Sequence, residues 1–188
     1  WQHKSSVSLK KFYVNRFRRL APALSLMLTI GLLISVLVLP PFGSQQDAAA
    51  TAIGAILLVA NVVIANTTGG YFDNAAELNP FLNTWSLSVE EQFYLIFPLM
   101  ILAGWWLSRS RERGQQLATR IVAMATVSSF VLMLLSAQVA SLPLEGIFGG
   151  FYGLGVRAWE FGVGALLVLV RIRAIPTRTK SATGVAGL

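Results

Sequence analysis

At residues 84–95 the chain reads Thr84-Trp85-Ser86-Leu87-Ser88-Val89-Glu90-Glu91-Gln92-Phe93-Tyr94-Leu95. Two adjacent carboxylates, Glu90 and Glu91, stand at the start of an apolar run that continues to Leu107. Placing a carboxylate in a bilayer costs about 2.5–3.5 kcal/mol on insertion scales, so such residues usually face a bundle interior or a wet cavity, where they bind or react. The stretch therefore predicts a membrane-spanning helix that carries a functional site.

The composition of the whole chain agrees with a membrane protein. The 188 residues are 55% hydrophobic and only 12% charged, about half the charged fraction of a soluble domain. Cysteine is absent and the one histidine, His3, precedes every apolar run. This excludes a cysteine nucleophile, a complete Ser-His-Asp triad and a metal site of histidine or cysteine ligands within this chain. The net charge of +7 comes mostly from Lys and Arg beside the apolar runs, so we expect no nucleic-acid partner.

Five apolar runs follow one another, most of them close to the roughly 20 residues that span a bilayer. They cover about residues 20–39, 48–65, 85–108, 117–140 and 147–170. We therefore predict an all-α, polytopic transmembrane bundle of about five hydrophobic helices. With no internal repeat and no linker, residues 1–188 are interpreted as a single domain.

The basic residues bear on how the runs cross the membrane. The clusters at 4–19, 109–113 and 171–180 all favour the cytoplasmic side. Three runs separate the first two clusters, and three crossings would put these clusters on opposite sides of the membrane. Either one of those runs is re-entrant or one basic cluster lies outside. The short 48–65 run is the candidate for a re-entrant helix.

Helical spacing groups the polar residues of the 84–95 stretch. At about 100° per residue, Ser86, Glu90 and Phe93 share one face, Tyr94 lies at its edge, and Glu91 points elsewhere. An oriented carboxylate on such a face suits a general base or acid. The alternative is structural: Ser86 caps the helix and the glutamates complement the positive end of its dipole.

Two further patterns place charges together. Arg16 and Arg19 are three residues apart and share a face, where two guanidiniums suit a phosphate or diphosphate. The alternative is an ordinary positive-inside anchor. Arg157 and Glu160 have the same spacing inside an apolar run and can neutralise one another, either as a structural ion pair or as part of a site. Gly162 and Gly164 follow them, and we expect both to let a neighbouring helix approach closely.

Taken together, these patterns resemble the acyltransferase 3 family of bacterial integral-membrane O-acyltransferases. The resemblance rests on Phe12-Tyr13-x-x-Arg16-x-x-Arg19-x-x-Pro22-Ala23, Thr84-Trp85-Ser86-Leu87-x-x-Glu90-x-x-Phe93-Tyr94 and Arg157-x-Trp159-Glu160-x-x-x-Gly164-Ala165. It covers essentially the whole chain but only the middle of a family domain. It implies a multi-pass enzyme of the bacterial inner membrane. Such an enzyme moves an acyl group, usually acetyl, from acyl-CoA to a hydroxyl, with no bound cofactor.

The same resemblance implies an acceptor and roles for individual residues. The acceptor is a cell-surface glycan or a lipid-linked saccharide, such as lipopolysaccharide, exopolysaccharide or peptidoglycan. The residues that correspond to acyl-CoA or substrate contacts are Arg16, Arg19, Tyr94, Arg157 and Glu160. The family's serine and glutamate match Ser86 and Glu90, with Ser88 and Glu91 as a fallback pair, and Trp85 or Ser86 would position the acyl group.

One part of the family pattern is absent. The family's histidine, thought to act in the transfer, lies in a first transmembrane helix that would precede Trp1. We therefore expect an internal fragment that is inactive by itself. Whether Glu90 acts directly as base or orients that histidine stays open. The alternative function is a transporter or flippase of a lipid-linked or anionic substrate, for which we would expect internal repeats.

Overall fold

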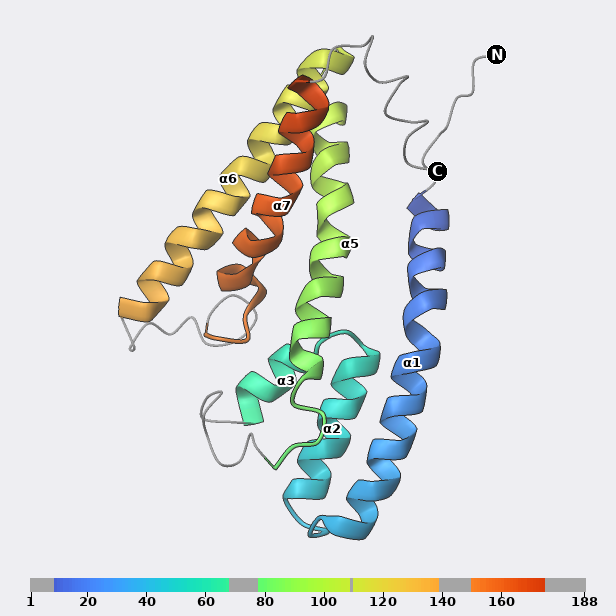
Figure 1. The fold of residues 1–188 in the computed structure, drawn as a ribbon. Helices are drawn as coiled ribbons and strands as arrows, with labels where there is room; N and C mark the ends of the chain where they lie inside the picture. The colour runs from blue at the N-terminus through green and yellow to red at the C-terminus, as the bar shows by residue number, and fades with distance from the viewer. Residues whose placement is uncertain (1–8, 68–77, 109, 139–149, 175–188) are drawn as a thin grey trace. The chain divides into compact units, whose positions relative to one another are not determined.

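A computed structural model describes residues 9–67, 78–108, 110–138 and 150–174 of the chain (Figure 1). The helices in these ranges are α1 (Leu9–Val38), α2 (Ser44–Ile56), α3 (Ala60–Thr67), α5 (Thr84–Trp106), α6 (Arg111–Gln138) and α7 (Leu154–Ala174). Over the described residues the predicted all-α class is confirmed. Three helices, α1, α5 and most of α6, are long and apolar enough to cross a membrane. Where the sequence predicted about five hydrophobic helices, the described residues thus form six helices, three of them candidate spans.

The chain forms two compact units. The first comprises Trp1–Gln92 and Glu145–Gly153, and the second Phe93–Leu144 and Leu154–Leu188. Helix α5 begins in the first unit and ends in the second. The interpretation of residues 1–188 as one domain stays a prediction.

Helix α1 joins the basic stretch and the first apolar run into one element. It has 30 residues and continues through Pro22, which gives a length of about 45 Å at 1.5 Å per residue. Leu28 is buried in the core of the first unit, and Phe81 packs directly on Gly31, where an added Cβ would lie 2.5 Å from its ring. The other buried core residues are Ala48, Ala52, Ala55, Ala60, Ile64 and Tyr152.

The second apolar run is broken into α2 and α3. These helices have 13 and 8 residues, about 20 and 12 Å, so neither spans the roughly 30 Å bilayer core alone. The break is a Schellman motif: Val59 N donates to Gly54 O, Leu58 N donates to Ala55 O, and Leu58 takes a φ of 59°. A re-entrant role for this broken segment stays a prediction.

Gly54 lets α2 and α3 pack closely. A Cβ on Gly54 would lie 2.8 Å from Val63 Cγ2 and 3.0 Å from the Cα of Ala60. The two helices therefore lie against one another, and Figure 1 shows α3 turning back after the break. The buried Asn79 fixes the turn before α5 to α2. Its side-chain amide donates to Thr51 Oγ1, and its Oδ1 accepts from Phe81 N.

In the second unit, α6 and α7 lie side by side (Figure 1). Gly162 of α7 lies directly against Thr126 of α6, which confirms the close approach predicted there. The same prediction for Gly164 is wrong over the described residues, because none of them would lie within 4 Å of a Cβ added there. Ser129 Oγ donates to Gly155 O at 2.6 Å and accepts from Trp159 N at 3.0 Å, so α6 also holds the first turns of α7.

The helix that corresponds to the fifth predicted run, residues 147–170, starts later than predicted. Helix α7 begins at Leu154, and residues 147–149 lie outside the described residues. Its apolar sequence is interrupted by charged residues, which keeps it out of the three candidate spans.

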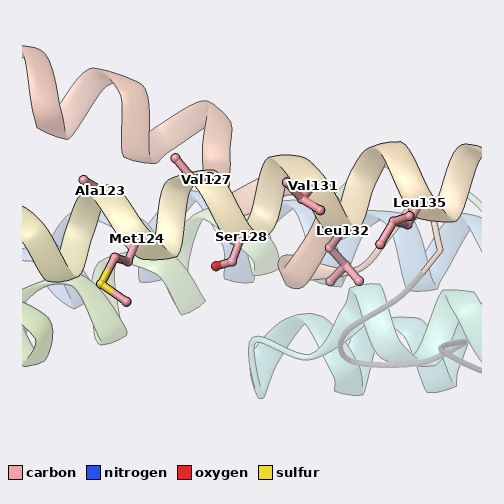
Figure 2. A pocket seen from close by; sticks show the side chains of 7 residues that line it. All are labelled: Ala123, Met124, Val127, Ser128, Val131, Leu132 and Leu135. Carbon is pink, nitrogen blue, oxygen red and sulfur yellow. The ribbon is translucent and has the colours of Figure 1, made fainter.

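One face of α6 carries a shallow apolar groove (Figure 2). The groove is lined by Ala123, Met124, Val127, Ser128, Val131, Leu132 and Leu135. Met124 and Val127 are largely exposed in it. Exposed apolar side chains along a long helix are typical of a surface that contacts lipid, because the lipid tails are as apolar as the side chains.

Candidate functional site

The two glutamates of the 84–95 stretch meet an arginine of α1. Nε of Arg16 donates to Glu91 Oε2 at 2.7 Å, and Nη2 of the same guanidinium donates to Glu90 Oε1 at 3.1 Å. One arginine therefore joins both carboxylates across 74 and 75 residues of sequence. The guanidinium offsets the repulsion between two neighbouring negative charges that would otherwise oppose their burial.

The three side chains of this cluster differ in exposure. The side chain of Glu91 is 10% exposed, that of Arg16 26%, and that of Glu90 41%. Glu91 is thus the enclosed partner and Glu90 the accessible one. A carboxylate that is held by a guanidinium and still reachable has the surroundings of a group that works on a substrate.

Ser86 and Trp85 contact other groups. Ser86 is exposed and its hydroxyl donates to the carbonyl of Asn83 at 3.0 Å, a local bond at the start of α5. Trp85 packs edge-on against Tyr152, with ring centroids 5.5 Å apart, and against Phe151 at 5.2 Å. Among the described hydrogen bonds, Ser86 is thus bonded to the backbone, whereas Glu90 is bonded to Arg16. Their catalytic roles stay predictions.

The residues beside the glutamates, Ser88 and Gln92, were not singled out as a pair by the sequence. Ser88 is buried and its hydroxyl accepts from Ala60 N at 3.1 Å, the first N–H of α3. The amide of Gln92 donates to Leu58 O at 2.7 Å and to Asn61 Oδ1 at 2.9 Å. Asn61 in turn donates to Tyr152 O at 3.1 Å. Two polar residues four apart in an apolar run were the available signal, because they share one helix face.

The remaining predicted residues are placed as follows. Arg19 is exposed on α1. In the second unit, the Tyr94 ring lies edge-on to Phe93 with centroids 6.3 Å apart, and Phe93 stacks on Phe161 of α7 at 5.1 Å. Arg157 Nη1 donates to Glu160 Oε1 at 2.9 Å, which confirms that these two neutralise each other within α7.

No group of three or more potential metal ligands occurs within the described residues. The charged cluster of the first unit consists of nitrogen–oxygen contacts between side chains. Its carboxylates are bound by an arginine, which supplies hydrogen bonds as well as charge.

The chain as a whole is similar to known proteins. A family model described as an acyltransferase domain matches residues 2–186. The peptidoglycan O-acetyltransferase OatA of Listeria monocytogenes is 29% identical over 194 residues, covering 100% of this chain and 29% of that protein. The putative peptidoglycan O-acetyltransferase YrhL of Bacillus subtilis is 28% identical over 167 residues, 88% of this chain and 24% of that protein.

A shorter match extends to a third genus. The O-acetyltransferase OatA of Staphylococcus aureus is 35% identical over 95 residues, which cover 50% of this chain and 15% of that protein. The chain thus spans less than a third of the length of these three relatives. No protein of solved structure matches the chain significantly.

Proposed function

Because the chain belongs to the acyltransferase 3 family, we propose that it forms part of a membrane O-acetyltransferase that uses acetyl-CoA and acts on a cell-surface glycan. One observation carries the proposal: Arg16 of α1 binds Glu90 and Glu91 together at the start of α5. This cluster contains residues from two of the patterns on which the family resemblance rests. The membership favours group transfer over the transporter alternative.

The chemistry needs few groups. Moving an acetyl group from a thioester to an alcohol takes a base for the hydroxyl proton, a donor for the developing oxyanion, and alignment of both substrates. The hydroxyl oxygen attacks the thioester carbonyl, the new C–O bond forms, the C–S bond breaks, and the proton ends on the departing CoA thiolate.

Glu90 has the accessible carboxylate in this cluster, with a side chain 41% exposed. We assign it the hydroxyl proton, which it takes up directly or through a base that it orients. Trp85 and Ser86 lie one turn earlier on α5 and would position the acyl group. Arg19 is exposed on α1 and matches one of the family's paired arginines. It would therefore contact the phosphates of acetyl-CoA.

The acceptor follows from the relatives. Two of them are named for peptidoglycan, so the glycan strand of the cell wall is the proposed acceptor. The reaction would then take place at a bacterial inner membrane, where acetyl-CoA lies on one side and the glycan or its lipid-linked precursor on the other. The three candidate spans would supply the membrane anchor.

The acceptor is tested in cells that lack their own glycan O-acetylation. The complete protein that contains this chain would be expressed, and acetate released by mild base would be measured from purified peptidoglycan and from the outer saccharide. Acetate on peptidoglycan that depends on the protein supports the proposal. Acetate on the outer saccharide alone would make the acceptor wrong, and none on any saccharide would reject the function.

A further inference from the structure

Arg16 and Arg19 have different surroundings, although their spacing of three residues made them look equivalent. Arg16 is half-buried and lies on the helix face of α1 that turns toward the rest of the first unit. That face also carries Tyr13, Leu20, Leu24 and Leu28, all half-buried or buried, at the three- and four-residue spacing of one helical stripe. Arg19 lies outside this stripe and is exposed.

The guanidinium of Arg16 is committed to protein groups. Its Nε and Nη2 both donate to carboxylate oxygens, one from Glu91 and one from Glu90. These two nitrogens form one of the edges with which arginine grips phosphate or carboxylate bidentately. In this structure the edge binds two carboxylates, so a phosphate using the same edge would have to displace them.

Glu90 and Glu91 differ in the same way. Glu91 has the shorter contact, 2.7 Å, and a side chain only 10% exposed, whereas Glu90 has a 3.1 Å contact and is 41% exposed. Removing one partner of an enclosed ion pair leaves an uncompensated charge, which is costly. Arg16 and Glu91 therefore form the fixed part of the cluster, and Glu90 is its reachable part.

We propose that Arg16 is a positioning residue, which together with Glu91 holds the Glu90 carboxylate at the site of transfer. The contact with the phosphates of acetyl-CoA then belongs to Arg19. This inference rests on the proposed function and divides the arginine pair into two roles, one acting on the reacting carboxylate and one on the donor substrate.

The backbone beneath the glutamates is fixed independently of Arg16. Ser88 accepts a hydrogen bond from Ala60 N, and Gln92 donates to Leu58 O, so the break between α2 and α3 and the first residue of α3 hold α5 on either side of the two glutamates. Loss of the Arg16 contacts therefore moves the carboxylates while the helix stays in place. The expected consequence is a change in turnover, with little change in the affinity for acetyl-CoA.

The test measures kcat and KM for acetyl-CoA with the complete protein in membranes at a saturating concentration of glycan acceptor. The variants are Arg16→Gln, Arg16→Lys and Arg19→Gln, and Arg18→Gln serves as the matched control because Arg18 is also exposed on α1. Every rate is divided by the amount of folded protein, measured as the monodisperse peak after solubilisation. Arg16→Lys retains the positive charge and reaches one carboxylate, so the role of Arg16 is tested even if Arg16→Gln fails to fold.

Loss of a charged hydrogen bond that acts in the transition state lowers a rate constant roughly 10- to 100-fold. Arg16→Gln should therefore lower kcat by that factor and leave the KM for acetyl-CoA nearly unchanged. Arg16→Lys should recover part of kcat. Arg19→Gln should raise the KM roughly 10-fold with kcat nearly intact. Because Arg16 and Glu91 act together on Glu90, the double variant Arg16→Gln with Glu91→Gln should lose little more kcat than Arg16→Gln alone.

Two results overturn the inference. If Arg16→Gln raises the KM as strongly as Arg19→Gln does while kcat is retained, both arginines bind the donor and Arg16 is no positioning residue. That result leaves the proposed function standing, because wild-type transfer is intact. If wild-type membranes transfer no acetyl group at all, the proposed function fails and the inference fails with it.

Discussion

The side-chain amide nitrogen of Gln92 lies 2.7 Å from the carbonyl oxygen of Leu58, at the break between α2 and α3. A helix break leaves backbone groups without helical partners, and in an apolar environment each must find another. Helix α5 provides two such partners, because Ser88 also accepts from Ala60 N at the same break. The residues that flank Glu90 and Glu91 thus fix a broken helix to the start of α5.

Replacing Gln92 tests this contact. Gln92→Leu keeps a similar volume but leaves Leu58 O and Asn61 Oδ1 without this donor, so we expect a loss of about 1–3 kcal/mol in the free energy of unfolding. Since Gln92 Oε1 is buried without a partner among the described residues, its removal returns part of that loss. The measurement is the melting temperature of the solubilised protein, with Gln116→Leu at an exposed α6 position as control. Equal melting temperatures for both variants would contradict the contact.

Ser88 and Ser86 offer a matched pair on α5. Ser88→Ala leaves the buried N–H of Ala60 without its acceptor and should cost about 1–3 kcal/mol of stability. Ser86→Ala removes only an exposed local bond to Asn83 O and should change stability by less than about 0.5 kcal/mol. Denaturant or thermal unfolding of the two variants side by side checks the order. A larger loss of stability for Ser86→Ala than for Ser88→Ala would contradict the hydrogen bond between Ser88 and Ala60 N.

Leu58 pays a conformational cost at the helix break. Its φ of 59° is in the left-handed region, which costs a residue with a Cβ about 1–2 kcal/mol. Leu58→Gly and Leu58→Ala both remove the side chain, but only glycine relieves that strain. The glycine variant should therefore be the more stable by about 1 kcal/mol, which unfolding of the two proteins compares directly. A more stable alanine variant would rule out this backbone conformation.

Gly162 and Gly164 separate packing from helix propensity on α7. A Cβ at Gly162 would collide with Thr126 of α6, whereas at Gly164 it would meet open space. Gly162→Ala should destabilise the protein by about 1–3 kcal/mol, as overpacking does. Gly164→Ala should be neutral or stabilising by up to about 1 kcal/mol, because alanine is the better helix former. Melting temperatures that fall equally for both variants would argue against this α6–α7 packing.

The sequence predicted the helical class but could not predict the break in its second apolar run. Residues Leu57, Leu58 and Val59 contain no glycine or proline, so local propensity gives no reason to stop a helix there. The break is stabilised by partners distant in sequence, Ser88 and Gln92, and hydropathy carries no information about them. The basic stretch and the first apolar run form one helix, α1, although hydropathy changes sharply between them, because helix propensity continues across the change from polar to apolar residues.

The charged residues of the candidate site were singled out from the sequence, but their contacts were predicted only in part. Arg16, Glu90 and Glu91 were all recognised, because charges next to apolar runs are costly and conspicuous. Helical spacing correctly separates Glu90 from Glu91 around α5, yet it cannot reveal that one guanidinium from α1 reaches both. Helical spacing placed Ser86 on the same face as Glu90, but it could not reveal that the Ser86 hydroxyl bonds the carbonyl of Asn83 in its own backbone turn.

Acetyl transfer by the Glu90→Gln variant tests the central claim most directly. Membranes containing the complete protein would receive radiolabelled acetyl-CoA and cell-wall glycan, with Glu112→Gln, an exposed glutamate of α6, as the matched control. Wild type and Glu112→Gln should label the glycan at equal rates, and Glu90→Gln should be at least roughly 100-fold slower, the usual loss when a general base is removed. Equal labelling by Glu90→Gln and wild type would contradict a transfer site at the Arg16–Glu90–Glu91 cluster.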